Sequence, residues 1–177
     1  MAQPMSSNSR VFVGYASAHG STQSVAGRVA ARLEERGVAV TVGPLSAGTH
    51  LPSDGAVIIG SAIHNRDWLP EATAFVRAHR EQLLVRPLWL FSVGMTAALP
   101  PPLRRLGRFE ERAIVRRADL GDSVRGTAVF SGRVAPEHFP ARGSRSAFRL
   151  LGCRYGDFRD WAAIDAWADS IAADLTQ

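Results

Sequence analysis

The sequence of 177 residues contains no lysine, so that all 21 of its basic residues are arginine. Arginine together with abundant alanine, glycine and proline indicates the coding bias of a GC-rich genome rather than a binding code. Without lysine, a phosphate loop of the GK[ST] type is excluded. The formal net charge is still +5. This basic balance keeps nucleic acid, anionic membranes and acidic ligands under consideration.

Cysteine is almost absent. Cys153 is the single one, so no intrachain disulfide is expected, and a reducing cytoplasm is the default compartment. A cysteine with no partner is expected to be inert. The five histidines show no paired spacing, and the sequence therefore predicts no metal site.

Long apolar runs are also missing. The longest uncharged stretch, residues 87–103, is too short for a bilayer and contains four prolines. Residues 1–9 have neither an apolar core nor a basic start, so they are expected to be a short disordered tail rather than a secretory signal. The chain length favours about one domain, and we expect residues 10–177 to form it.

Strand and helix patterns alternate along the chain, which predicts an α/β fold with a parallel sheet covered on both faces. Residues 100–118 and 133–159 fit this pattern less well, apart from a short helix expected around residues 146–151. The expected strands cover residues 10–15, 38–42, 56–60, 88–93 and 127–132, and the expected helices cover residues 23–36, 69–84 and 161–175.

Ligands of open α/β sheets bind at the carboxyl ends of the strands. Three loops leave such ends, at residues 16–22, 61–68 and 92–98. The first contains S17-A-H-G-S-T22, in which hydroxyls and a glycine precede a helix and can form an anion nest. Such a loop suits a phosphate monoester such as that of FMN. The alternative is a serine-rich turn that only caps its helix.

Several segments resemble the flavodoxin family. Y15-A-S-A-H-G-S-T22 resembles its FMN phosphate loop, and A56-V-I-I-G-S-A-I-H64 resembles its third strand. Further segments are most similar to the menaquinone-dependent protoporphyrinogen oxidases of this family and to related bacterial flavodoxin-domain proteins. They are E71-A-T-A-F-V-R-A-H79, Phe91-Ser92-Val93 and D160-W-A-A-I164.

The resemblance implies a flavodoxin-like three-layer sandwich with strand order 2-1-3-4-5 and FMN as cofactor. It places the phosphate at the first loop and the isoalloxazine ring between the other two, with Ile63, His64, Trp68 and Met95 as stacking candidates. The implied cofactor-binding residues are Ser17, Ala18, His19, Gly20, Ser21 and Thr22, then Ser61, Ala62, Ile63, His64, Asn65 and Trp68, and finally Ser92, Val93, Gly94 and Met95.

His64 is the candidate catalytic residue, because a histidine beside the flavin can hold or relay a proton near neutral pH. The alternative is a loop histidine that contacts only solvent. The loop GMTAALP at residues 94–100 has no aromatic residue, unlike the flavin-covering loops of many flavodoxins. One face of the flavin is therefore expected to be open, as a substrate-oxidising flavoprotein requires.

Arginines also recur at helical spacing between residues 104 and 117. This basic stripe is either a solvated face or a docking surface for propionate groups, an anionic membrane or an acidic partner. Residues 133–159 occupy the place of a hydrophobic and basic segment that, in the resembled oxidases, is associated with activity and membrane contact. No motif indicates nucleic-acid binding. The stripe consists of Arg104, Arg108, Arg112 and Arg116, with Arg105 and Arg117 beside them.

The first functional hypothesis is an FMN-dependent oxidoreductase of the protoporphyrinogen-oxidase type, with a quinone as acceptor. The alternative is a flavodoxin-type electron carrier that serves a redox partner protein. Carriers of that type are typically acidic, so a net charge of +5 counts against the second hypothesis. We also expect a small-molecule reductant and a cytoplasmic location. Peripheral contact with the inner face of the membrane and a homodimer are further expectations.

Overall fold

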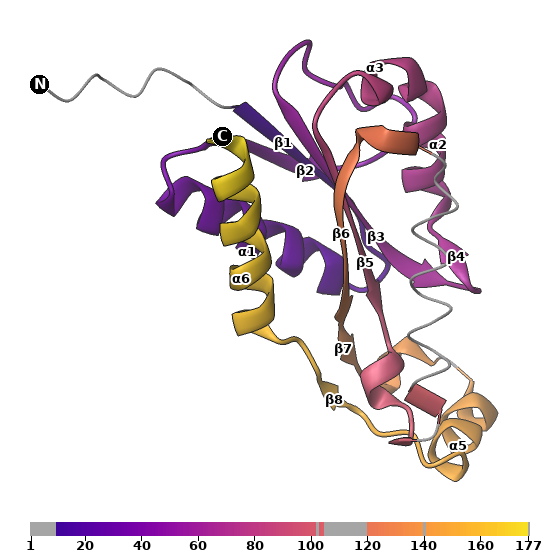
Figure 1. Ribbon diagram of the computed structural model, residues 1–177. Coiled ribbons are helices and arrows are strands. Elements are labelled where there is room, and N and C mark those ends of the chain that lie inside the picture. The colour runs from indigo at the N-terminus through magenta and orange to yellow at the C-terminus, as the bar shows by residue number, and fades with distance from the viewer. Residues whose placement is uncertain (1–9, 102, 105–119, 140, 177) are drawn as a thin grey trace, which may run out of the picture.

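The structure, a computed structural model, describes residues 10–101, 103–104, 120–139 and 141–176. Its main sheet is parallel, with the order β2-β1-β3-β5-β6 (Figure 1). Counted along the parallel strands this is the order 2-1-3-4-5, so the predicted fold is confirmed. The tail expected at residues 1–9 lies outside the described residues. The strands are β1 Arg10–Ala16, β2 Ala39–Pro44, β3 Ala56–His64, β5 Leu88–Gly94 and β6 Val124–Ser131.

Helices cover both faces of the sheet and complete three layers (Figure 1). On one face lie α1 (Ser21–Glu35) and α6 (Trp161–Leu175), and on the other lie α2 (Pro70–Ala78) and α3 (Arg80–Leu84). Each face has its own cluster of buried apolar side chains. The central strands β3 and β5 are buried over almost their whole length, because a strand covered on both sides has no solvent face.

The helix predicted over residues 69–84 is wrong as a single element. The chain leaves the helical conformation at His79, where φ is −110°, and α3 starts at the next residue. The His79 ring lies 4.6 Å from the Phe75 ring, and its Nε2 is 3.0 Å from the carbonyl oxygen of Thr49. His79 thus lies at the junction between two helices, with its Nε2 paired.

The loop predicted after the third strand is a short hairpin. β3 continues to His64 and pairs antiparallel with β4 (Asp67–Trp68). Asn65 and Arg66 form the turn, with φ of 50° and 64°. Positive φ at both central residues is typical of tight two-residue hairpin turns. Two other boundaries also shift, because α1 begins at Ser21 and β6 begins at Val124.

Residues 132–139 and 141–158 form a lobe at the carboxyl end of the sheet (Figure 1). The sequence predicts only a short helix here, whereas the structure has several elements around a separate small core. That core contains Ala98, Val134, Phe148 and Cys153, with Phe139 and Tyr155 against it. The elements are β7 Arg133–Val134, η3 Pro136–His138, α5 Arg142–Leu150 and β8 Gly156–Asp157, of which β7 and β8 pair antiparallel.

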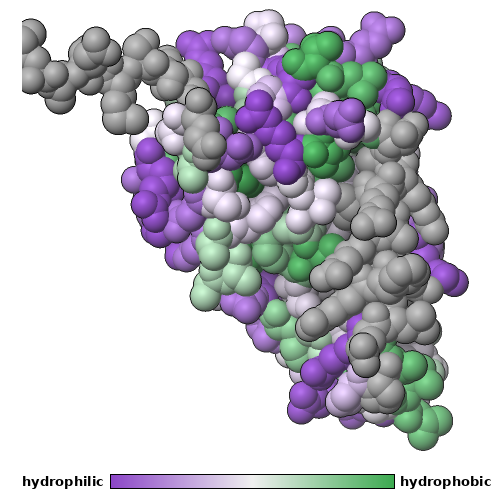
Figure 2. Space-filling view, viewed as in Figure 1, coloured by the Kyte–Doolittle hydropathy of each residue, from purple (hydrophilic) through white to green (hydrophobic). Residues whose placement is uncertain are grey.

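The tip of the lobe is apolar and basic. Leu150 and Leu151 at the end of α5 are 91% and 65% exposed, and green apolar surface lies at this lower end of the molecule in Figure 2. None of the residues between His138 and Asp157 is acidic, but four are arginine. Among the described helices, none has the length and apolar character to cross a membrane.

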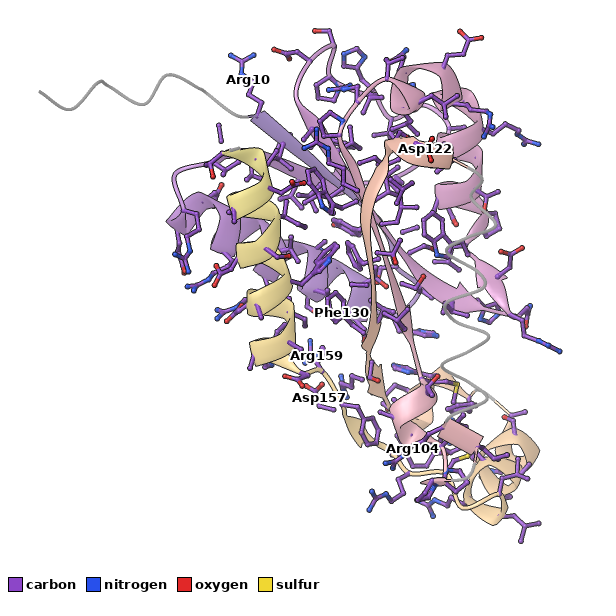
Figure 3. All side chains as sticks on the ribbon, in the orientation of Figure 1. Arg10, Arg104, Asp122, Phe130, Asp157 and Arg159 are labelled. Atoms are coloured by element: carbon purple, nitrogen blue, oxygen red, sulfur yellow. The ribbon has the colours of Figure 1, made fainter. Side chains whose placement is uncertain are left out.

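The basic stripe predicted between residues 104 and 117 is described only at its start. Arg104 donates through Nε to the carbonyl oxygen of Leu99 at 2.8 Å, and Figure 3 shows it at the lobe end of the molecule. The other members, Arg105, Arg108, Arg112, Arg116 and Arg117, lie outside the described residues.

Ion pairs join α1 to α6 across more than 130 positions of sequence. Arg28 makes two hydrogen bonds of 2.6 Å to Asp165. Arg32 and Arg36 both bind the Asp169 carboxylate at 2.8–2.9 Å. Hydrogen bonds from these two guanidinium groups lower the pKa of Asp169 from 3.8 to about 2. The pairs fix the position of α6 along α1.

We expect Asp169→Asn to destabilise the fold at neutral pH but not in strong acid. Because the pKa of Asp169 is lower in the folded state, its carboxylate stabilises the fold above about pH 4, and this contribution is lost between about pH 4 and 2. Thermal unfolding followed by circular dichroism from pH 7 to pH 2 measures the difference. Asp122→Asn, at an exposed residue in η2, is the control. An Asp169→Asn deficit of equal size at pH 2 would contradict the ion-pair explanation.

Candidate functional site

A pocket of about 330 Å³ lies at the carboxyl edge of the sheet. The strand ends are level there, because Ala16 pairs with Ser61 and Ser61 pairs with Ser92 in the parallel register. The loops after β1, β3, β5 and β6 therefore meet around one space. Twelve of the predicted cofactor-binding residues line it, namely Ser17, Ala18, His19, Ser21, Thr22, Ala62, Ile63, His64, Asn65, Val93, Gly94 and Met95.

The first loop turns sharply into α1. Gly20 adopts φ +84°, a left-handed conformation that glycine takes without strain, and its N–H donates to Ser17 Oγ at 3.0 Å. The helix begins at Ser21, and no side chain in the described part of the chain caps it. The N–H groups of its first turn therefore remain available to an anion at the pocket.

Three hydroxyls of this loop keep a free hydrogen to donate. Ser17 Oγ accepts from Gly20, and Ser21 Oγ accepts from the N–H of Arg133 at 3.0 Å. Thr22 is 1% exposed, and its Oγ1 has no hydrogen-bond partner among the described residues. Leaving a buried hydroxyl unpaired costs about 1–3 kcal/mol. The loop thus contains several hydrogen-bond donors that lack an acceptor. The oxygens of a bound phosphate would supply the acceptors.

The lobe is joined to the pocket at Gly132. Its N–H donates to the carbonyl of Gly94 at 2.9 Å, and its own carbonyl accepts from Phe158 at 3.3 Å. A Cβ at this position would lie 3.1 Å from the Cβ of Ser21 and 3.1 Å from Cγ1 of Val93. A side chain here would require Ser21 or Val93 to move by a few tenths of an ångström, so the chain after β6 passes close to both α1 and β5.

The loop after β6 supplies pocket residues that the sequence analysis did not predict. His138 of η3 stacks on His19 of the first loop, with ring centroids 4.1 Å apart and planes inclined by 7°. Ligands of open α/β sheets bind at the carboxyl ends of the strands, and β6 is one of these strands. The same reasoning would therefore have indicated the loop after β6. The additional lining residues are Gly132, Arg133, Val134, His138 and Phe139.

Ser61, Trp68 and Ser92 lie beneath the pocket and do not line it. Both serines are completely buried, and Trp68 is 7% exposed. Trp68 Nε1 donates to Ser92 Oγ at 2.8 Å, and Ser61 Oγ accepts from the N–H of Leu69 at 3.0 Å. The structure therefore gives Trp68 a supporting position inside the fold, away from the stacking position that the resemblance implies.

The end of the pocket away from α1 is open. His64 and Asn65 at the tip of the β3–β4 hairpin are exposed, and Met95 is 38% exposed. Of the described lining residues, Phe139 is the one that carries a benzene ring. A planar ligand at this end would contact aliphatic and histidine side chains and remain accessible to a second molecule.

The described residues outside the pocket add no second chemical centre. Cys153 is buried in the lobe, and burial raises the pKa of its thiol, so it carries little thiolate. No group of three histidine, cysteine, aspartate or glutamate side chains with the geometry of a metal site occurs in the described ranges. The pocket is therefore the part of the described chain where ligand chemistry is concentrated.

A family model described as flavodoxin domain matches residues 12–140. Among curated proteins, none has a significantly matching sequence. The structure of a flavodoxin from the domain Archaea is 15% identical with a TM-score of 0.55, and the alignment covers 95% of this chain and 99% of that one. A cysteine-to-serine mutant of flavodoxin from Pseudomonas aeruginosa is 15% identical with a TM-score of 0.57, with 95% and 99% covered.

A further similar structure is rubredoxin oxygen:oxidoreductase from Desulfovibrio gigas, with 17% identity and a TM-score of 0.62. The alignment covers 96% of this chain but only 36% of that protein. These identities support the fold alone, whereas the family match extends over more than half of the sequence. FMN is the cofactor of that family. By its sequence match and its strand order, the chain belongs to the flavodoxin domain family.

Proposed function

We propose that this chain is an FMN-binding redox protein and that the pocket at the carboxyl edge is its flavin site. The unpaired Thr22 Oγ1 is the observation that carries the proposal. A buried hydroxyl at the start of a helix, beside two further hydroxyl donors, fits a phosphate monoester. No charged side chain is needed for this, since amides and hydroxyls together neutralise the anion.

The two ends of the pocket suit the two ends of FMN. Ser17, Ser21 and Thr22 would hold the phosphate together with the first amides of α1. The hairpin residues Ala62, Ile63, His64 and Asn65 and the loop of Val93, Gly94 and Met95 would flank the ring system. When bound, FMN supplies a centre that takes up two electrons, either singly or as a hydride.

The open end supports an enzyme rather than a carrier. Exposed Met95 and His64 leave room for a second small molecule beside the flavin, and the net charge of +5 is opposite to that of acidic carrier flavodoxins. We therefore propose an oxidoreductase that takes a hydride and a proton from a small organic reductant and passes the same two electrons and two protons to an acceptor. The flavodoxin-type electron carrier is the alternative.

Within this class, the protoporphyrinogen-oxidase-like reaction with a quinone as acceptor is the more specific proposal, and it rests on the sequence resemblance. His64 is its candidate proton relay. Peripheral membrane contact is supported by the exposed Leu150 and Leu151 beside Arg149. The cytoplasmic location and the homodimer remain predictions.

Thr22→Val should weaken FMN binding and at the same time stabilise the protein without FMN. Valine has nearly the same shape but removes a buried hydroxyl that lacks a partner. The ligand-free protein should gain about 1 kcal/mol, whereas FMN affinity should fall about tenfold because one hydrogen bond to the phosphate is lost. Urea unfolding and quenching of FMN fluorescence measure the two effects.

Riboflavin, which lacks the phosphate, is the control ligand, and its affinity should stay within twofold of the wild-type value. Thr41→Val on the exposed edge strand β2 is the control variant and should change neither quantity. Equal losses for FMN and riboflavin would place the phosphate elsewhere. Failure of the wild-type protein to bind FMN would refute the proposed function.

Anaerobic mixing of the FMN-loaded protein with protoporphyrinogen distinguishes the enzyme from the carrier. If the proposal is correct, the visible flavin absorbance decreases within seconds and is restored by a soluble menaquinone analogue. His64→Gln should slow the reduction at least tenfold, because positioned proton transfer contributes about 100-fold or more. His50→Gln is the matched control at another exposed histidine. A flavin reduced by a reductase protein but by no small molecule would favour the carrier.

A further inference from the structure

His138 reaches the phosphate loop from a different part of the chain. It lies in η3 of the lobe, 117 to 121 positions after Ser21 and Ser17, yet its ring stacks on His19 at 4.1 Å. The lobe is held there by the hydrogen bond from the Arg133 N–H to Ser21 Oγ and by the close approach of Gly132 to the same serine. His138 and the loop therefore share one wall of the pocket.

A hydrogen bond to the ring favours one tautomer of His138. The backbone N–H of Ala135 lies 3.4 Å from Nδ1. Because that N–H can only donate, Nδ1 must accept. A neutral imidazole with Nδ1 as acceptor carries its hydrogen on Nε2. Among the described residues Nε2 has no hydrogen-bond partner in the protein, so His138 offers a free donor at the pocket.

The surroundings of His138 favour this neutral form. Burial lowers its pKa from the ordinary value, and so do the charges of His19 and Arg133, whereas Glu137 opposes them. The side chain of Glu137 is itself paired with Arg133 at 3.0 Å, so it is shared rather than directed at the ring alone. In the ligand-free protein these surroundings therefore favour the uncharged ring, which is an N–H donor.

We propose that His138 is a phosphate-binding residue of this chain, a neutral donor that the lobe supplies to complete the anion site of the first loop. The proposal rests on the proposed function, because it assumes that FMN occupies the pocket. It extends that function by assigning a second arm of the phosphate site to the segment after β6. The stacked His19 ring positions His138, and the ring of His138 in turn restrains the loop that carries His19.

Two variants separate the donor from the ring. His138→Phe keeps a flat ring against His19 but removes the N–H, whereas His138→Gln keeps an N–H donor but removes the ring. We expect His138→Phe to weaken FMN binding by about tenfold or more, as the loss of a hydrogen bond to a charged group implies. His138→Gln should bind FMN more tightly than His138→Phe. His50→Phe, at an exposed histidine outside the pocket, is the matched control.

Riboflavin makes the test specific for the phosphate and reports on folding as well. Each variant should bind riboflavin within twofold of the wild-type protein. The wild-type to His138→Phe ratio of FMN affinities should stay at about tenfold or more at pH 8.5, where the imidazole of the ligand-free protein is uncharged. Nitrogen NMR should also show His138 as the Nε2–H tautomer at pH 7 with and without FMN.

The outcomes separate the two proposals. If the wild-type protein binds no FMN, the proposed function fails. If FMN binds but His138→Phe is unchanged, or loses FMN and riboflavin equally, His138 does not contact the phosphate and this inference is wrong. A ratio that falls to about one at pH 8.5 would show that only the charged imidazolium contributes, and would overturn the neutral-donor assignment.

Discussion

The close approach of Gly132 to Ser21 is the constraint on which the pocket depends. At this point the chain after β6 lies against the first residue of α1, and the N–H of Gly132 also donates to the carbonyl of Gly94 at the end of β5. The hydrogen bonds from Arg133 N–H to Ser21 Oγ and from Arg154 N–H to the carbonyl of Ala98 hold the lobe in the same position. As a result, one wall of the pocket comes from the lobe, a segment beyond the five alternating strands and their helices.

Beneath the pocket, buried hydrogen bonds position the surrounding segments. Hydrogen bonds are more directional than apolar contacts. The indole N–H of Trp68 reaches Ser92 from the hairpin that follows β3. Ser61 accepts the N–H of Leu69, the residue that precedes α2. Each of these hydrogen bonds ties a loop to a neighbouring strand. The tip of the hairpin, with His64 and Asn65, is thus held over the pocket by groups that never contact a ligand.

The sheet and the phosphate loop were predictable because their signals are local. A fully apolar strand such as residues 56–60 indicates burial on both faces by itself, and the loop of residues 17–22 contains all of its own donors. The lobe was not predictable in the same way. Its core joins Phe148 to Ala98 across 50 positions, and no periodicity within residues 133–159 records that contact.

The missed site residues have the same cause. His138 becomes a pocket residue only because its ring meets His19 in space, and Trp68 leaves the pocket only because a hairpin turn directs it toward Ser92. The break at His79 likewise coincides with a hydrogen bond to the distant Thr49. Residue type and spacing give the chemistry that a position can perform, but tertiary contacts decide which positions perform it together.

Helix α1 connects stability to function in this chain. Its first turn destabilises the ligand-free fold, since among the described residues the Thr22 hydroxyl is buried without a partner and the first amides of the helix lack acceptors. The rest of the helix offsets that cost, because Val25, Val29 and Leu33 are completely buried against the sheet and its arginines bind α6. A phosphate that fills the donors would remove the penalty and stabilise the folded state by mass action. The unfavourable first turn can therefore persist in the ligand-free protein, because these apolar contacts and ion pairs stabilise the rest of the helix.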